Sequence, residues 1–391
     1  MSEIIYFDNS ATTKISDEAL KTYIDVSRDF FANPSSLHSL GFMAERELRS
    51  AKETILDTLK AKDCELIFSA SGSEANNLAI LGRAFSKDRY RKGCKIITTE
   101  GEHASVLEPL ERLKKEGFEI KRIKTHGGKI DLEELKAELT PNVILISIMM
   151  VNNETGAIYD YKSVSALTRA MCPEALLHLD CTQSYLKIPF TFLNTGADML
   201  TLSSHKIEGP RGAGALVVKK SVLKARGLAP LIYGGGQELG LRSGTENVAA
   251  ACAFATAAKI GHGEFRKREE KLCALRDYLI EEILKNPALS HLYVTRPPCH
   301  APHIVNITVP DIKSETMLHF LSSKNIFVSS GSACSSNSSD KSSALLAFGH
   351  TEKMADSSIR ISFSHRNEKW EIDRFISVLA EGVSSLSRIK K

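Results

Sequence analysis

Lys206 is the residue whose type and setting first suggest chemistry in this chain. Two serines and a histidine come directly before it, and a Gly-Pro turn follows it within residues 202–212. Strand-like segments at 198–202 and 213–218 flank this stretch, so we expect the lysine on a short connection between two strands. A lysine in a partly desolvated pocket can act as an amine nucleophile. Taken alone, the stretch favours the simpler interpretation, a surface lysine in a loop.

Other polar residues follow further predicted strands. Strand-like runs at 64–69, 95–99, 143–149 and 176–179 alternate with helical patterns at 44–59, 75–84, 105–115, 132–139 and 162–171. Such alternation predicts an α/β fold with a mostly parallel sheet flanked by helices, in which ligands bind at the carboxyl ends of the strands. The polar residues at those ends are His103, Asn152, Asn153, Glu154, Asp180, Gln183, Ser203, His205 and Lys206.

The strand at 64–69 leads into Gly72 and Ser73, at the start of a predicted helix. Small residues there leave backbone N–H groups available to hold an anion such as phosphate. No Gly-Lys-Ser/Thr sequence follows, so this is not a Walker motif. Ser73 would equally serve as a simple helix cap, and the two interpretations have similar weight at this stage.

A lysine, a carboxylate, an imidazole and an anion site together are the equipment for pyridoxal phosphate. The lysine binds the cofactor covalently, and the carboxylate keeps the pyridine nitrogen protonated so that the ring acts as an electron sink. The helix start would hold the phosphate. The combination therefore indicates a pyridoxal-phosphate enzyme.

A series of short motifs, in one order along nearly the whole chain, carries a family resemblance. They lie at 6–13, 32–36, 102–103, 151–156, 178–184, 204–206, 234–238, 242–245, 329–334 and 357–360. With them the chain resembles the cysteine desulfurases (NifS/IscS-like), a branch of the class V aminotransferase-like enzymes. The resemblance implies the PLP-dependent transferase fold type I, with a large domain, a smaller α+β domain and a homodimer.

The resemblance also implies a role for each matching residue. Lys206 matches the Schiff-base lysine, and His103 matches the imidazole that stacks on the ring and moves protons. Asn153 and Arg360 match the site for the substrate carboxylate, which suits the planar fork of arginine. The implied cofactor contacts are Gly72, Ser73, His103, Asn153, Asp180, Gln183, Ser203, His205, Lys206 and Thr245, the last of which is given by the other subunit.

Cys334 lies in a serine-rich stretch, 329–343, whose composition cannot pack a core and predicts a mobile loop. On the residues alone an incidental loop cysteine is the simpler interpretation. The resemblance instead implies the catalytic thiol, which takes sulfur from L-cysteine as a persulfide while L-alanine is released. Because only the thiolate attacks, a base is required, and His103 is the candidate. The sulfur would pass to an acceptor or scaffold protein for iron–sulfur clusters or thiolated products.

Three other functions stay open from the sequence: selenocysteine lyase, another class V aminotransferase-like activity, and a catalytically idle scaffold. A transaminase needs no loop cysteine, and a decayed enzyme would be expected to lose Lys206 or Asp180. The chain also departs from the family pattern at Ala32, His303, Leu239 and Leu346. The last two replace common arginines, which would alter either the surface that meets an acceptor protein or the edge of the dimer.

Composition and charge bear on the partners, the location and the domains of the protein. The chain has 391 residues, 42% apolar and 25% charged residues, and a net charge of +4, with no basic run that would indicate nucleic acid. No apolar run reaches the roughly 20 residues that span a membrane, and the start lacks a secretory pattern, so we expect a cytoplasmic protein. The eight cysteines form no C-x-x-C pair, so we expect no metal site. We expect a large domain at 15–260 and a small one formed by 1–14 and 261–391, which carries the loop at about 329–343.

Overall fold

The computed structural model describes residues 3–87, 93–330 and 342–388. Its largest sheet has seven strands in the order β2-β8-β7-β6-β5-β3-β4. The strands are β2 (Cys64–Ser69), β3 (Lys95–Thr99), β4 (Glu119–Ile123), β5 (Val143–Met149), β6 (Leu176–Asp180), β7 (Met199–Ser203) and β8 (Gly214–Lys219). All pairs are parallel except those of β8, which runs antiparallel to both of its neighbours.

Helices cover both faces of this sheet, because successive strand residues point to opposite sides. Ile96 packs in a core with α3 (Gly72–Ala84) and α5 (Ala104–Lys115). Ile97, the next residue, packs in another core with α2, α6, α7 and α10. These and the remaining helices of this half are α1 (Asp17–Asp29), α2 (Ser39–Thr58), α6 (Leu132–Glu138), α7 (Tyr161–Met171), α8 (Phe192–Thr195), α9 (Lys220–Lys224) and α10 (Val248–Gly263).

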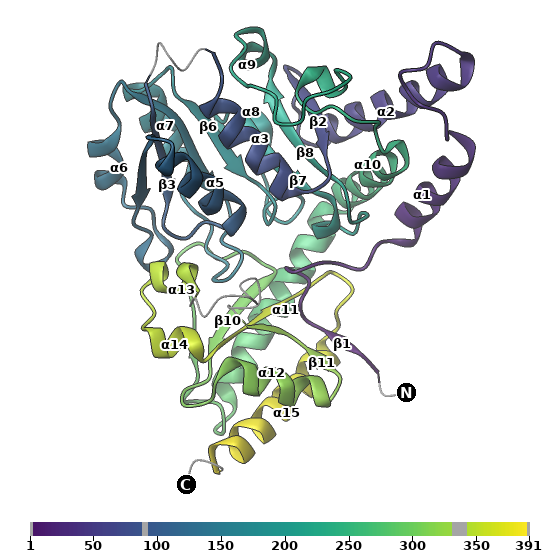
Figure 1. Cartoon of the computed structure of the whole chain (residues 1–391). Helices are drawn as coiled ribbons and strands as arrows, with labels where there is room; N and C mark the ends of the chain where they lie inside the picture. Colours follow the sequence, from purple (N-terminus) through teal and green to yellow (C-terminus); the bar gives the residue numbers. More distant parts are fainter. Residues whose placement is uncertain (1–2, 88–92, 331–341, 389–391) are drawn as a thin grey trace.

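A second sheet lies at the other end of the molecule, and α11 (Phe265–Lys285) runs toward it from the first (Figure 1). It is antiparallel, in the order β12-β13-β10-β9. Its strands are β9 (Tyr293–Val294), β10 (Ile304–Thr308), β12 (Ser329–Ser330) and β13 (Ser358–Ser362). The other helices of this half are α12 (Ser314–Ser323), α13 (Ser343–Phe348), α14 (Glu352–Asp356) and α15 (Lys369–Arg388). Two short strands, β1 (Ile5–Tyr6) and β11 (Ile326–Phe327), pair in parallel beside it.

The second sheet has its own hydrophobic core. Ile5 and Phe7 join it from the start of the chain, and its other buried members lie between 272 and 383. The two long helices α10 and α11 follow each other in the chain, with Glu264 between them. The proposed domain boundaries at 14/15 and 260/261 stay a prediction.

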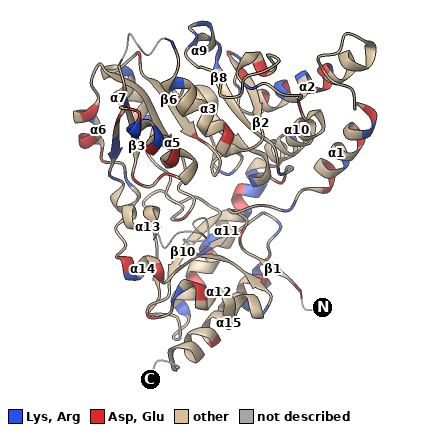
Figure 2. Cartoon of the chain, viewed as in Figure 1, with Lys and Arg blue, Asp and Glu red and all other residues tan. Residues whose placement is uncertain are grey.

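The α/β class and the mixed, mostly parallel sheet are confirmed, with β8 as its antiparallel strand. One detail differs from the sequence-based expectation, since strand β4 was not predicted. Charged residues of both signs are scattered over the two halves (Figure 2). Among the described residues, no helix is long and apolar enough to cross a membrane.

Candidate active site

A cavity of about 290 Å³ lies at the carboxyl ends of the parallel strands. This is close to the lower end of the usual range for ligand pockets, about 300–1,000 Å³. Ten of the residues expected at the site line it: Gly72, Ser73, His103, Asn153, Asp180, Gln183, Ser203, His205, Lys206 and Arg360. They come from segments that are far apart in the chain, as expected if the strand ends form one site.

Lys206 ends a short 3-10 turn that follows β7, between two antiparallel neighbouring strands. Its Nζ donates hydrogen bonds to the carbonyl of Ala11, at 2.7 Å, and to that of Ser10. The N-terminal segment also binds this turn, since Thr13 N donates to the carbonyl of His205 at 2.9 Å. The predicted short connection is thus confirmed, and the lysine amine is held at the cavity.

Asp180 is the last residue of β6 and is only 6% exposed. One carboxylate oxygen accepts from Thr182 N at 2.9 Å, and the other accepts from Asn76 Nδ2 at 2.7 Å. Donors on both oxygens fix the direction in which the carboxylate faces the cavity. Asn76 was not identified from the sequence, because nothing local marks a helix asparagine as the partner of a strand carboxylate.

His103 lies after β3 and is itself the N-cap of α5, where its Nδ1 accepts from Ser105 N at 3.1 Å. Burial lowers the pKa of His103, and the positive charges of Lys206 and Arg360 lower it further, against an opposing effect of Asp180. The imidazole is therefore held in its neutral form at the cavity wall.

The anion site is formed by the start of α3. Ser71 caps this helix by accepting from Glu74 N at 3.1 Å, so the interpretation of Ser73 as the cap is wrong. A Cβ at Gly72 would lie 3.2 Å from Thr182 Oγ1 and 3.3 Å from a side-chain atom of Ser203, so only glycine leaves this space open. The backbone at Gly72 and Ser73 thus stays accessible from the cavity.

His205 lines the same cavity, and its Nδ1 lies 3.1 Å from Thr12 Oγ1. Burial lowers the pKa of His205 to about 4, and Lys206 and Arg211 add to the effect. A neutral imidazole at this place can donate a hydrogen bond without adding a charge.

Arg360 reaches the cavity from β13 of the second sheet. Its Nη1 donates to the carbonyl of Asn153, and its Nη2 donates to Asp8 Oδ1, both at 2.9 Å. These bonds position the guanidinium, and each terminal nitrogen retains a second N–H group for an anionic substrate. Asp8 was missed as a site residue because its partner is 352 residues away in the chain.

These groups fit pyridoxal phosphate. The cavity contains an amine for covalent attachment, a fixed carboxylate for a ring nitrogen and a helix start for a phosphate. Ser10 Oγ, in the cavity wall, is buried and has no hydrogen-bond partner among the described residues. An unpaired buried hydroxyl carries a cost that a bound polar ligand would remove.

One described residue among the predicted site residues does not line this cavity. Thr245 is exposed and lines a separate hollow with Glu238 and Arg242, so its assignment to a site on another subunit stays a prediction. Cys334 lies outside the described residues. The seven cysteines that are described are all free thiols.

Glu102 is a buried carboxyl group next to His103, and burial raises its pKa to about 8, with a further contribution from Asp180. Its Oε1 accepts from Thr99 Oγ1 at 2.6 Å and from Met149 N at 2.9 Å. Between pH 4.5 and about 8 the folded protein holds a proton that the unfolded chain has released. The free energy of unfolding should therefore decrease as the pH rises through this interval.

We expect Glu102→Gln to flatten that pH dependence, because the amide keeps the acceptor oxygen and never ionises. Above pH 8 the variant should be more stable than the wild type by on the order of 5 kcal/mol. Urea unfolding at a series of pH values measures this. Parallel pH profiles for the two proteins would contradict the assignment.

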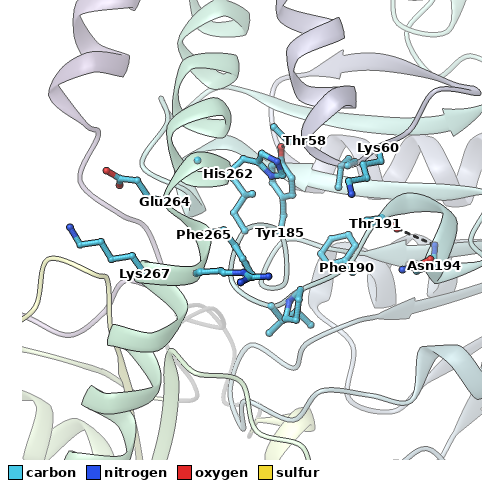
Figure 3. A pocket seen from close by; sticks show the side chains of 16 residues that line it. Thr58, Lys60, Tyr185, Phe190, Thr191, Asn194, His262, Glu264, Phe265 and Lys267 are labelled. Carbon is cyan, nitrogen blue, oxygen red and sulfur yellow. Dashed lines mark hydrogen bonds between the residues drawn. The ribbon is translucent and has the colours of Figure 1, made fainter.

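A larger cavity of about 760 Å³ lies between the end of α2, the segment after β6 and the start of α11 (Figure 3). Phe190, Tyr185 and Phe265 line it, with Lys60 and Lys267 among the charged residues. Tyr185 Oη is already bonded to Thr58 Oγ1 at 2.6 Å. None of the residues expected at the cofactor site lines this cavity, so chemistry rather than size identifies the candidate active site.

Comparison with known proteins gives consistent similarities. The family model described as aminotransferase class-V matches residues 5–375. The chain is 38% identical to a "NifS/IcsS protein homolog" of Lactobacillus delbrueckii subsp. bulgaricus, over 99% of both chains. It is 35% identical to "Cysteine desulfurase IscS 1" of Archaeoglobus fulgidus, covering 96% of this chain and 95% of that one. A solved "NifS-like protein" superposes with a TM-score of 0.89 at 30% identity, over 98% of this chain and 100% of that one.

Proposed function

The chain belongs to the aminotransferase class-V family and is a pyridoxal-phosphate-dependent cysteine desulfurase, and we propose that it transfers the sulfur of L-cysteine onto Cys334 and releases L-alanine. The observation that carries the proposal is the meeting of Lys206, Asp180, His103 and Arg360 in one cavity. Formation of alanine from L-cysteine by the pure, cofactor-loaded protein tests this function, and absence of alanine would contradict it.

Pyridoxal phosphate, when bound, supplies an electron sink that stabilises negative charge at the substrate carbon. Lys206, Asp180 and the start of α3 would hold it. Gln183 adds an amide beside it, with Nε2 donating to the Ser10 carbonyl at 2.9 Å. We assign to Lys206 Nζ the removal of the proton from the substrate Cα.

Arg360 and Asn153 are assigned to the substrate. The guanidinium binds the carboxylate of L-cysteine, which orients the Cα and the thiol with respect to Lys206 and Cys334. Asp8 helps to hold Arg360 in place, because its Oδ1 accepts a hydrogen bond from Nη2 at 2.9 Å.

The sulfur step uses Cys334. Its thiolate attacks the sulfur of the substrate, so an S–S bond forms and the Cβ–S bond breaks. The carbon fragment gains a proton at Cβ and leaves as L-alanine. The balance is one thiol and one L-cysteine giving one persulfide and one L-alanine, with no external oxidant.

Both chain segments that flank residues 331–341 contact residues that line the cavity or are next to one that does, which supports the assignment of Cys334. On one side, Ser329 pairs in register with Arg360. On the other, Ser342 Oγ donates to Glu154 at 2.5 Å, next to Asn153.

We expect Arg360→Lys to lower kcat/KM for L-cysteine about 100-fold, mostly through KM, because a lysine cannot reproduce the bidentate pairing with a carboxylate. Steady-state alanine formation measures it. Arg366→Lys is the matched control, since Arg366 pairs with Glu208 at 3.1 Å and does not line the cavity. A loss confined to kcat would contradict the assignment of Arg360 to the substrate carboxylate.

A homodimer is part of the proposal. Large apolar side chains are exposed along α1, α2 and the segment between them: Leu20, Ile24, Phe31, Leu37, Leu40, Phe42 and Met43. An apolar surface of this kind favours association, and Thr245 would then reach the cofactor of the other subunit. Sedimentation should give about twice the 43.0 kDa of one chain. A species of one chain mass at micromolar concentration would contradict it.

The persulfide sulfur is proposed to pass to an acceptor or scaffold protein for iron–sulfur clusters or thiolated products. A cytoplasmic, reducing compartment fits this role, because the thiol of Cys334 has to be regenerated after each transfer.

A further inference from the structure

We propose that Asn76 and Ser105 are positioning residues that fix the tautomer of His103, so that this imidazole presents an Nε2–H donor to the cofactor and substrate. The inference rests on the proposed function for its consequence, but its evidence is a chain of hydrogen bonds that runs from Asp180 to His103. Every direction in that chain follows from the chemistry of the groups.

The chain of hydrogen bonds starts at the carboxylate of Asp180, whose oxygens can only accept hydrogen bonds. The Asn76 atom that lies 2.7 Å from it must therefore be Nδ2, since an amide oxygen there would face like charge. Asn76 is 1% exposed, and its Oδ1 has no hydrogen-bond partner among the described residues. The carboxylate of Asp180 therefore decides which end of this amide carries the hydrogens.

Asn76 Nδ2 carries a second hydrogen, which points to Ser105 Oγ at 2.8 Å. The serine oxygen accepts that bond, so its own hydrogen is available for the remaining neighbour. That neighbour is His103 Nδ1, also at 2.8 Å. The hydroxyl can donate to the ring, but its oxygen has a second lone pair, so the direction is decided by the other contact of Nδ1.

A second donor meets the same ring nitrogen. Ser105 N donates to His103 Nδ1 at 3.1 Å, as part of the cap of α5. A nitrogen that accepts from an amide and a hydroxyl cannot carry a hydrogen of its own. In the neutral imidazole the proton must then lie on Nε2.

This tautomer changes the task that His103 can perform. Nε2 carries a hydrogen and cannot take a proton from Cys334 or from the substrate. Protonation at Nδ1 would break both bonds from Ser105. His103 therefore serves as a neutral hydrogen-bond donor, and deprotonation of the Cys334 thiol falls to another group.

The surroundings of His103 favour its neutral form. Burial opposes protonation of the ring most strongly, Lys206 and Arg360 oppose it further, and Asp180 acts in the other direction. The bonds from Ser105 act in the same direction as burial, because they stabilise the form whose Nδ1 lone pair is free to accept.

Nitrogen NMR of the cofactor-loaded protein, labelled with ¹⁵N-histidine, tests the proposal without depending on turnover. The signal of His103 is identified by its loss in His103→Gln. We expect a protonated Nε2 and an unprotonated Nδ1 near neutral pH. A protonated Nδ1 would overturn the proposal, whether or not the protein forms alanine.

Ser105→Ala tests the positioning role. Loss of the hydroxyl leaves one donor on Nδ1, so the proton affinity of His103 should rise about fivefold, and the acid limb of the kcat/KM profile should move to higher pH. Ser105→Thr keeps the hydroxyl, so the proton affinity of His103 and the acid limb of the kcat/KM profile should both equal those of the wild type. Asn77→Ala is the matched control on α3, since its amide donates to the Ser73 carbonyl at 2.9 Å instead. An unchanged titration of His103 in Ser105→Ala would overturn the role of Ser105.

The role of Asn76 is tested by coupling. If Asn76 acts through Ser105, the increase in the proton affinity of His103 that Ser105→Ala causes should be smaller in an Asn76→Ala background. Equal changes in the two backgrounds would overturn the part assigned to Asn76. The result is read from the NMR titration, so failure of the desulfurase assay would leave it interpretable.

Discussion

Lys206→Ala is expected to abolish the near-visible absorbance of the cofactor-loaded protein and to lower alanine formation from L-cysteine by at least about 10⁴-fold. The reason is that no other lysine lines the cavity among the described residues. Without its amine the protein loses both the covalent attachment of the cofactor and the group assigned to the proton at Cα. Absorbance spectra and alanine assays on the purified variant measure the two losses.

Lys220→Ala serves as the control for this variant. Lys220 is half exposed and follows the end of β8 that lies away from the cavity, and its Nζ is 3.7 Å from Glu65 Oε1. Both its absorbance and its activity should equal those of the wild type. A Lys206→Ala protein that keeps the absorbance band would show that the cofactor is attached elsewhere.

Cys334→Ala is expected to lower alanine formation from L-cysteine by about 10³-fold while leaving the cofactor absorbance unchanged. The two effects separate because the cofactor site and the sulfur acceptor are different residues. The exposed thiols Cys94 and Cys299 provide matched controls, and their replacement by alanine should leave the rate unchanged.

Full activity of Cys334→Ala on L-cysteine would contradict the persulfide step. Alanine formed by the wild type from selenocysteine but not from cysteine would instead favour selenocysteine lyase activity.

Much of the fold and the candidate site could be predicted from the sequence. The buried strands are the clearest case: β5 is seven apolar or small residues, all buried, and its limits agree with the prediction. The lysine, the carboxylate and the imidazole were found because parallel strands place their carboxyl ends at one edge.

The sequence could not reveal features that depend on partners far along the chain. The strand β4, Glu119–Ile123, is polar because it lies at the edge of the sheet, so it gave no apolar signal. The direction of β8 follows from pairing on both sides. Asp8 and Asn76 have functional partners 352 and 104 residues away, and no local pattern marks either.

The central claim is that sulfur leaves L-cysteine on Cys334. A single-turnover experiment, in which cofactor-loaded protein meets L-cysteine without reductant or acceptor, tests it most directly. We predict that each active site forms one alanine and that mass spectrometry finds one added sulfur on the peptide containing Cys334. Alanine released together with free sulfide, with Cys334 unmodified, would contradict the account.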